Sequence, residues 1–273
     1  MKKAEAGFSR LFLIIVGSIV LVLVVCYSWG FQTMIWWKFS RDFSKKMPIV
    51  NLTPQSLPNV AANSSEGMKL SHVGFEFEVP WADLDKEKSK VVRNLAVFAF
   101  RSGRVIMFYG PSPTHEDLLS EIEKEMGDKD HNKLRQLFGP EATRTNYAFH
   151  KTLLEETPAR LSPWMSRREA LRSSFLLTFK IVSSVGGETG LFNVAAHDWE
   201  GFQFDDPAKQ PTRVTLELYD SQDRHVEIIF LWKKNEGVDV TQADLNRVLQ
   251  TLKPGDPLFA AETIKPADSK IHN

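Results

Sequence analysis

The longest apolar stretch of the chain covers residues 11–29 and contains no charged side chain. As a helix it would span roughly 28 Å, about the thickness of a bilayer's hydrocarbon core. A cleaved signal peptide would have a shorter apolar core followed by a small-residue cleavage site. A buried core helix rarely runs this long without charge. The pattern therefore predicts a transmembrane helix with an aromatic interface over residues 11–37, anchored by Leu11, Ile15, Val20, Leu23, Trp29, Trp36 and Trp37.

The residues that flank this stretch indicate its orientation. Three basic residues precede it and four follow it, so the positive-inside count is nearly balanced. A short tail is easily kept inside, and long domains translocate largely regardless of charge. We therefore expect residues 1–10 to be a cytoplasmic tail and the C-terminal domain to be extracytoplasmic. The protein would then be a single-pass protein of the inner (plasma) membrane, with the lipid bilayer as a partner.

The composition changes after the predicted span. Residues 38–46 are basic, and residues 48–67 contain three prolines and several Asn and Ser without a helical or strand period. We expect a basic flank and linker over residues 38–67 and an extracytoplasmic α+β domain over residues 68–253. The polar residues 254–273 would form a flexible tail.

Alternation of apolar and polar residues predicts strands in the first part of this domain. Residues 74–80 (GFEFEVP) alternate apolar and acidic side chains, so Glu76 and Glu78 share one face, which we expect to be solvated. Residues 93–100 and 105–109 are apolar runs on either side of Ser102-Gly103. Glycine tolerates a positive φ, so this pair suits the turn of a hairpin.

Apolar residues at helical spacing follow in the middle of the chain. They predict helices over residues 112–127, 132–138, 146–155 and 167–185. Strand patterns then return over residues 190–195, 199–204, 212–219 and 226–232, and a short helix begins after Thr241.

One stretch near the C-terminus repeats an earlier one. Residues 201–207 (GFQFDDP) have the same G-F-polar-F-acidic-x-P form as residues 74–80. The repeat fits either a duplicated β unit or two edge strands that each end at proline. The predicted fold class is α+β: an N-terminal transmembrane helix, a linker, then a largely antiparallel sheet covered by helices, with two similar β units as one option.

The charge balance argues against a nucleic-acid partner. The chain has 34 Lys and Arg against 34 Asp and Glu, and no block of like charges follows residue 47. Nucleic-acid binding would need a concentrated basic face. The single cysteine, Cys26, lies in the apolar stretch, so no intrachain disulfide can form. This suits a bacterial envelope protein.

The stretches GFEFEVP (residues 74–80) and LNRVLQTLKP (residues 245–254) frame an order of strands, central helices, further strands and a terminal helix. In this the chain resembles PsbP-like α/β/α sandwich domains. The resemblance implies an extracytoplasmic binding or assembly module rather than an enzyme, and it transfers no site residues. The helical insert over residues 112–185 is longer than the family leads us to expect.

The candidate chemistry is sparse. No two of the seven histidines have the spacing of a metal site, and we expect them at surface or capping positions. Residues 128–139 begin like a calcium loop, but Lys133 and Gly139 stand where that loop needs Gly and Glu. We therefore predict no catalytic, cofactor-binding or metal residue and no cofactor. Pairing of the late strands could still gather four polar candidates: His197, Asp198, Asp205 and His225.

Three functional hypotheses follow. The first is a non-catalytic binding or scaffold module at the extracytoplasmic membrane surface, docking a small ligand or another envelope or membrane protein. Its marker would be an exposed aromatic residue in a loop beside charge, such as Trp81, Trp164 or Trp199. The alternative is an unrecognised envelope hydrolase that uses carboxylates with His197 or His225. A cleft joining His197 and Asp198 to Asp205 or Asp206 would favour it.

The third hypothesis is an accessory subunit of the inner membrane. Its span would pack on partner helices through the small residues Gly17 and Ser18.

Overall fold

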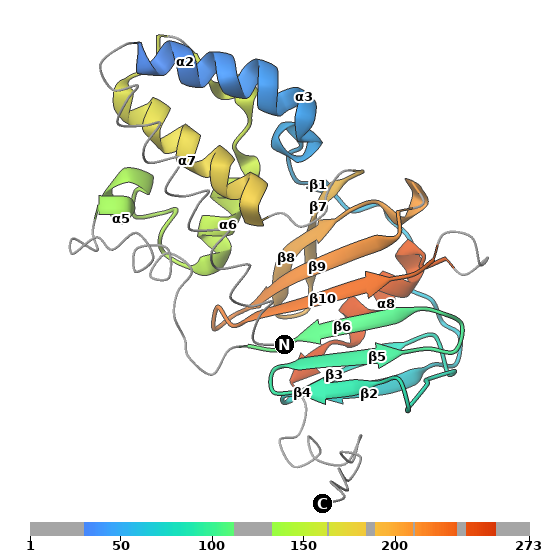
Figure 1. Ribbon diagram of the computed structural model, residues 1–273. Coiled ribbons are helices and arrows are strands. Elements are labelled where there is room, and N and C mark those ends of the chain that lie inside the picture. Colours follow the sequence, from blue (N-terminus) through green and yellow to red (C-terminus); the bar gives the residue numbers. More distant parts are fainter. Residues whose placement is uncertain are drawn as a thin grey trace, which may run out of the picture. The chain divides into compact units, whose positions relative to one another are not determined.

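The computed structural model describes residues 30–111, 133–162, 164–183, 189–209, 211–233 and 239–254. The chain divides into two compact units, and each unit is built from two separated stretches of sequence. Residues 30–53 and 133–183 belong to a helical unit, and residues 54–111 and 189–254 belong to a β unit (Figure 1). The single domain expected over residues 68–253 is thus shared between two units.

The helical unit is a set of short helices around one longer helix. Two predicted helices are confirmed with their N-terminal bounds, at Asn146 and Arg167, and Thr145 caps the first by accepting a hydrogen bond from the Ala148 N–H at 3.0 Å. The elements are α2 (Phe31–Trp37), the π-helix η1 (Lys38–Phe43), α3 (Ser44–Lys46), the 3-10 helix η2 (Pro48–Asn51), α5 (Lys133–Phe138), α6 (Asn146–Glu155), the 3-10 helix η3 (Pro158–Arg160) and α7 (Arg167–Ser183).

A fully buried lysine joins three segments of this unit. Lys180, on α7, donates hydrogen bonds to the carbonyl oxygens of Leu52 at 2.6 Å, Leu154 at 2.6 Å and Glu156 at 2.8 Å. Burial lowers the pKa of Lys180 to about 8, although the Glu156 carboxylate opposes the shift. The amine is therefore mostly protonated at neutral pH and can donate to all three carbonyls.

The β unit contains two sheets. The larger has the strand order β1-β7-β8-β9-β10-β6-β5-β4, antiparallel throughout except for the β1–β7 pair, and the smaller has the order β11-β3-β2. The elements are β1 (Gln55–Ser56), β2 (Met68–His72), β3 (Phe75–Val79), β4 (Lys90–Val92), β5 (Leu95–Ala99), β6 (Val105–Tyr109), β7 (Leu191–Ala196), β8 (Trp199–Phe204), the 3-10 helix η4 (Pro207–Lys209), β9 (Arg213–Asp220), β10 (His225–Leu231), α8 (Gln242–Thr251) and β11 (Lys253–Pro254).

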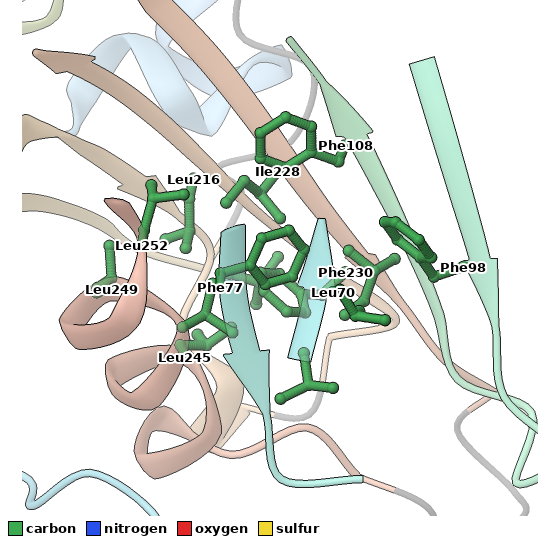
Figure 2. Packing of buried hydrophobic residues seen from close by; sticks show 14 of the residues in the cluster. Leu70, Phe77, Phe98, Phe108, Leu216, Ile228, Phe230, Leu245, Leu249 and Leu252 are labelled. Carbon is green, nitrogen blue, oxygen red and sulfur yellow. The ribbon is translucent and has the colours of Figure 1, made fainter. Parts of the chain in front are cut away.

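The core of the β unit lies between the large sheet and a layer formed by the small sheet and α8 (Figure 2). The alternation predicted for β3 is confirmed, because Phe75, Phe77 and Val79 are buried while Glu76 and Glu78 are half-buried. The Phe77 and Phe108 rings stack with their centroids 5.4 Å apart. The other residues labelled around them in Figure 2 are Leu70, Phe98, Leu216, Ile228, Phe230, Leu245, Leu249 and Leu252.

The predicted turn and cap of this unit are also confirmed. β5 and β6 form the expected hairpin, and Gly103 has the expected positive φ, 89°. The loop has three residues, 101–103, rather than the expected two, because the Phe100 N–H donates to the Arg104 carbonyl. Thr241 begins α8 with a capping box, because its side chain accepts from the Asp244 N–H and the Asp244 side chain accepts from the Thr241 N–H. Local signals therefore place these elements correctly.

The predicted fold class is wrong in how the sheet is covered. One face of the large sheet packs against a second sheet and α8, whereas α5, α6 and α7 belong to the helical unit. The period-2 pattern of β2 and β3 is the same whether they extend the large sheet or form a layer on it, so the pattern could not distinguish the two.

The transmembrane part of that fold class is not supported either. No helix within the described ranges is long and apolar enough to cross a membrane. Leu11, Ile15, Val20, Leu23 and Trp29 lie outside those ranges, as do the helix expected over residues 112–127 and the tail 255–273. Trp36 and Trp37 lie in the short helix α2.

The segment expected to be a linker makes specific contacts. β1 pairs with β7, and the Asn63 N–H donates to the Ala243 carbonyl at 2.9 Å. The Asn63 side chain donates to Asp244 at 2.7 Å. Proline and asparagine therefore mark an irregular but anchored segment here.

The two G-F-x-F stretches occupy different positions. β3 belongs to the small sheet and β8 to the large one. Gly74 lies in the β2–β3 turn with φ 75°, whereas a Cβ at Gly201, inside β8, would collide with the Glu217 carbonyl. The two glycines thus meet different requirements.

We predict that Lys180→Met destabilises the helical unit by about 3–5 kcal/mol, because three backbone carbonyls, two of them buried, lose a charged donor. Urea unfolding followed by far-ultraviolet circular dichroism measures the loss. Lys151→Met, at an exposed position on α6, is the matched control and should change stability by less than about 0.5 kcal/mol. Equal effects of the two substitutions would contradict the prediction.

Candidate binding cleft

A cleft of about 440 Å³ lies on the outer side of the small sheet. Three parts of the β unit form it: the strands β2 and β3, the turn between β7 and β8, and the end of α8 with β11. Its lining residues are Lys69, Glu76, Phe77, Glu78, His197, Asp198, Trp199, Gln250, Thr251, Leu252, Lys253 and Pro254.

The acidic residues of β3 project into this cleft because the apolar residues of the same strand face the core. Glu76 lies opposite Lys253 in the β3–β11 pair, and their side chains form an ion pair at 3.2 Å. Glu78 forms an ion pair with Arg247 at 3.0 Å and lies 4.0 Å from Lys69. Both carboxylates are therefore neutralised by basic partners.

The edge of β3 is closed by the end of α8. The Glu78 N–H donates to the Thr251 hydroxyl at 2.8 Å, next to the β3–β11 pair. The Thr251 hydroxyl in turn donates to the Arg247 carbonyl at 2.7 Å. Because the Thr251 hydroxyl both accepts and donates a hydrogen bond, it is not a candidate nucleophile.

The β7–β8 turn docks on the C-terminus of α8. His197 has φ 52°, a conformation that histidine adopts more readily than most residues, and its Nε2 lies 2.9 Å from the Gln250 carbonyl oxygen. Since a carbonyl only accepts, Nε2 carries the proton. Trp199 Nε1 donates to the Leu252 carbonyl at 3.1 Å. The hairpin thus satisfies two carbonyls that α8 leaves without helical partners.

The structure brings together two of the four polar candidates. His197 and Asp198 line the cleft, but Asp205 follows the far end of β8, about 20 Å away for a strand of this length. Asp205 is buried and accepts from the Thr189 N–H at 3.0 Å and its hydroxyl at 2.9 Å. His225 stacks on Tyr219 with ring centroids 4.8 Å apart.

These placements bear on the hydrolase alternative. The cleft joins His197 to Asp198 but not to Asp205 or Asp206, so the arrangement that would have favoured a hydrolase is not formed. Within the described ranges, no group of three or more His, Cys, Asp and Glu side chains is arranged to hold a metal ion.

Two histidines differ from the expectation of surface positions. His72 and His150 are both buried. Burial lowers the pKa of His72, and a hydrogen bond with the Asn94 backbone opposes the shift. The ring of His72 packs edge-on against Phe108 with centroids 6.0 Å apart, so this histidine belongs to the core rather than to a site.

A row of titratable side chains on the other face of the large sheet was not predicted. Glu227 pairs across strands with Glu217 on β9 and with Tyr109 on β6. Burial raises the pKa of Glu227 to about 7; the nearby Glu217 adds to the shift and Arg213 opposes it. Burial and then Glu227 raise the pKa of Tyr109. The sequence could have predicted this pair of glutamates. In the predicted hairpin over residues 212–232, a turn centred on residue 222 places residue 217 opposite residue 227.

Comparison with models of protein families and with curated proteins finds no match for this chain. The resemblance to PsbP-like domains therefore stays a prediction, as do the functional hypotheses.

We predict that Glu227 makes stability fall as pH rises between about 4.5 and about 7. In this range the folded protein holds a proton on Glu227 that the unfolded chain releases, so deprotonation favours unfolding, by up to about 1.4 kcal/mol per pH unit. Urea unfolding of wild type and Glu227→Gln across this range measures the difference.

The stability of Glu227→Gln relative to wild type should rise with pH, whereas that of the exposed-site control Glu87→Gln should not. Parallel pH profiles for all three proteins would contradict the assignment.

Proposed function

We propose that the β unit is a non-catalytic binding module whose ligand occupies the cleft. The pairing of both cleft glutamates with basic side chains supports this, because the ion pairs join β3 to β11 and α8 and so give each carboxylate a structural role. The cleft is also assembled from three separate parts of the β unit, which suits a preformed binding site.

The groups that remain available indicate the ligand chemistry. In the described part of the chain, Asp198 is exposed at the cleft and its carboxylate has no ion-pair or hydrogen-bond partner. In the tautomer that donates from Nε2 to the Gln250 carbonyl, the His197 Nδ1 atom is an acceptor, and the exposed Gln250 side-chain amide can accept as well. The site therefore favours a small polar ligand rich in hydrogen-bond donors, such as an amine or a polyol.

We predict that an amine probe such as putrescine perturbs the His197 ring and Trp199 indole signals in nuclear magnetic resonance spectra, whereas acetate does not. Asp198→Asn should weaken the amine interaction roughly tenfold or more, because hydrogen bonds to charged groups contribute about 1.5–3 kcal/mol. Glucose tests the polyol alternative in the same spectra.

Glu200→Gln is the control, since Glu200 is an exposed acid on the same hairpin that does not line the cleft. It should leave the perturbations unchanged. Perturbations that survive Asp198→Asn, or that acetate produces equally, would overturn the proposed ligand class. If putrescine, acetate and glucose all leave the spectra unchanged, the cleft is not the binding site.

The extracytoplasmic location forms a separate part of the proposal. Protease added to spheroplasts that express the full chain should digest the β unit while a cytoplasmic marker protein stays intact. Protection of the β unit until the inner membrane is lysed would place it in the cytoplasm and exclude an envelope partner.

A further inference from the structure

An almost fully exposed tryptophan lies in the helical unit. Trp164 is 93% exposed, whereas Trp81 and Trp199, the other two aromatic candidates, are buried. Its backbone is fixed in the turn before α7, where the Trp164 N–H donates to the Ser162 hydroxyl at 3.2 Å and the Met165 N–H donates to the Ser162 carbonyl at 3.2 Å. A tryptophan side chain this exposed is unusual, because tryptophan is highly buried on average.

Exposed arginines surround this turn in the sequence. Arg160 precedes it and lies 3.9 Å from the buried Glu156 carboxylate, and Arg167 and Arg168 form the first turn of α7. The only acidic residue between positions 158 and 172 is Glu169. We call Arg160, Trp164, Arg167 and Arg168 the Trp164 surface.

Arg167 and Arg168 lie at the end of α7 where the macrodipole disfavours cations. Cations at a helix N-terminus oppose the macrodipole, at a cost of about 0.3–1 kcal/mol each. The helix is capped without them, because the Ser166 N–H donates to the Glu169 carboxylate at 2.8 Å and the Glu169 N–H donates to the Ser166 hydroxyl at 3.2 Å. Arg168 also donates to the Gln136 carbonyl at 2.6 Å, which orients its side chain.

We propose that the Trp164 surface docks on a membrane that contains anionic lipids. The indole of tryptophan partitions to the headgroup level of a bilayer, and arginine binds phosphate groups through paired N–H donors. A protein partner would have to desolvate the indole in a well-packed pocket. The described residues beside Trp164 in the chain are Ser162, Met165 and Ser166, of which only Met165 is apolar. The proposal is independent of the cleft and its ligand.

Tryptophan fluorescence of the full chain tests this proposal. The chain is mixed with phosphatidylcholine vesicles, with or without phosphatidylglycerol, that carry a nitroxide-labelled lipid at headgroup depth. Quenching should be larger with phosphatidylglycerol, and Trp164→Ala should remove that additional quenching. Val92→Ala is the control, since Val92 is an apolar residue of the β unit that is 53% exposed, and it should retain the additional quenching.

The arginine contribution is measured by vesicle titration. Arg167→Gln should weaken binding to phosphatidylglycerol vesicles about fivefold, since one basic residue near an anionic surface contributes about 1 kcal/mol. Lys86→Gln, an exposed site on the β unit with the same change of charge, should have no effect.

Two results would overturn the proposal. One is equal quenching with and without phosphatidylglycerol, which would mean that any vesicle association owes nothing to anionic lipid. The other is equal quenching of wild type and Trp164→Ala. That result would mean that Trp164 does not contact the vesicle, and a protein partner would then explain its exposure.

Discussion

The two-sidedness of β3 is the constraint on which the β unit depends. Its phenylalanines pack between the large sheet and α8, so its glutamates must face the other way. The two glutamates form ion pairs with Arg247 of α8 and Lys253 of β11, and these pairs hold the end of the helix beside the strand. The cleft is thus a by-product of core packing, and its polar character follows from the same alternation that builds the core.

The helical unit has a different organising contact. Lys180 occupies a buried position on α7, where an apolar residue would be expected. It donates hydrogen bonds to carbonyl oxygens at the end of η2 and at the end of α6. Removing a buried charge from water is costly, so such a lysine persists only where several acceptors converge on it. Its geometry therefore specifies how three segments of this unit meet.

Local sequence signals predicted the elements well and their assembly poorly. The Thr241 cap, the Gly103 turn and the bounds of α6 follow from residues within one turn of each other, and each is confirmed. The layer formed by β2 and β3 and the burial of His72 depend on contacts between residues far apart in the chain. Candidates such as His197 and Asp198 could be named, but their separation from Asp205 depended on the length of β8.

The sheet order has a consequence for how the chain is made. β6 pairs with β10, which follows it only after the whole sequence of α5, α6 and α7 has been synthesised. A nascent chain that has emerged as far as β6 therefore exposes an unpaired strand edge and the apolar face of β5 and β6. Such surfaces are prone to aggregation, and pairing over this sequence distance is slow. Chaperone demand should consequently peak midway through translation, before β10 leaves the ribosome.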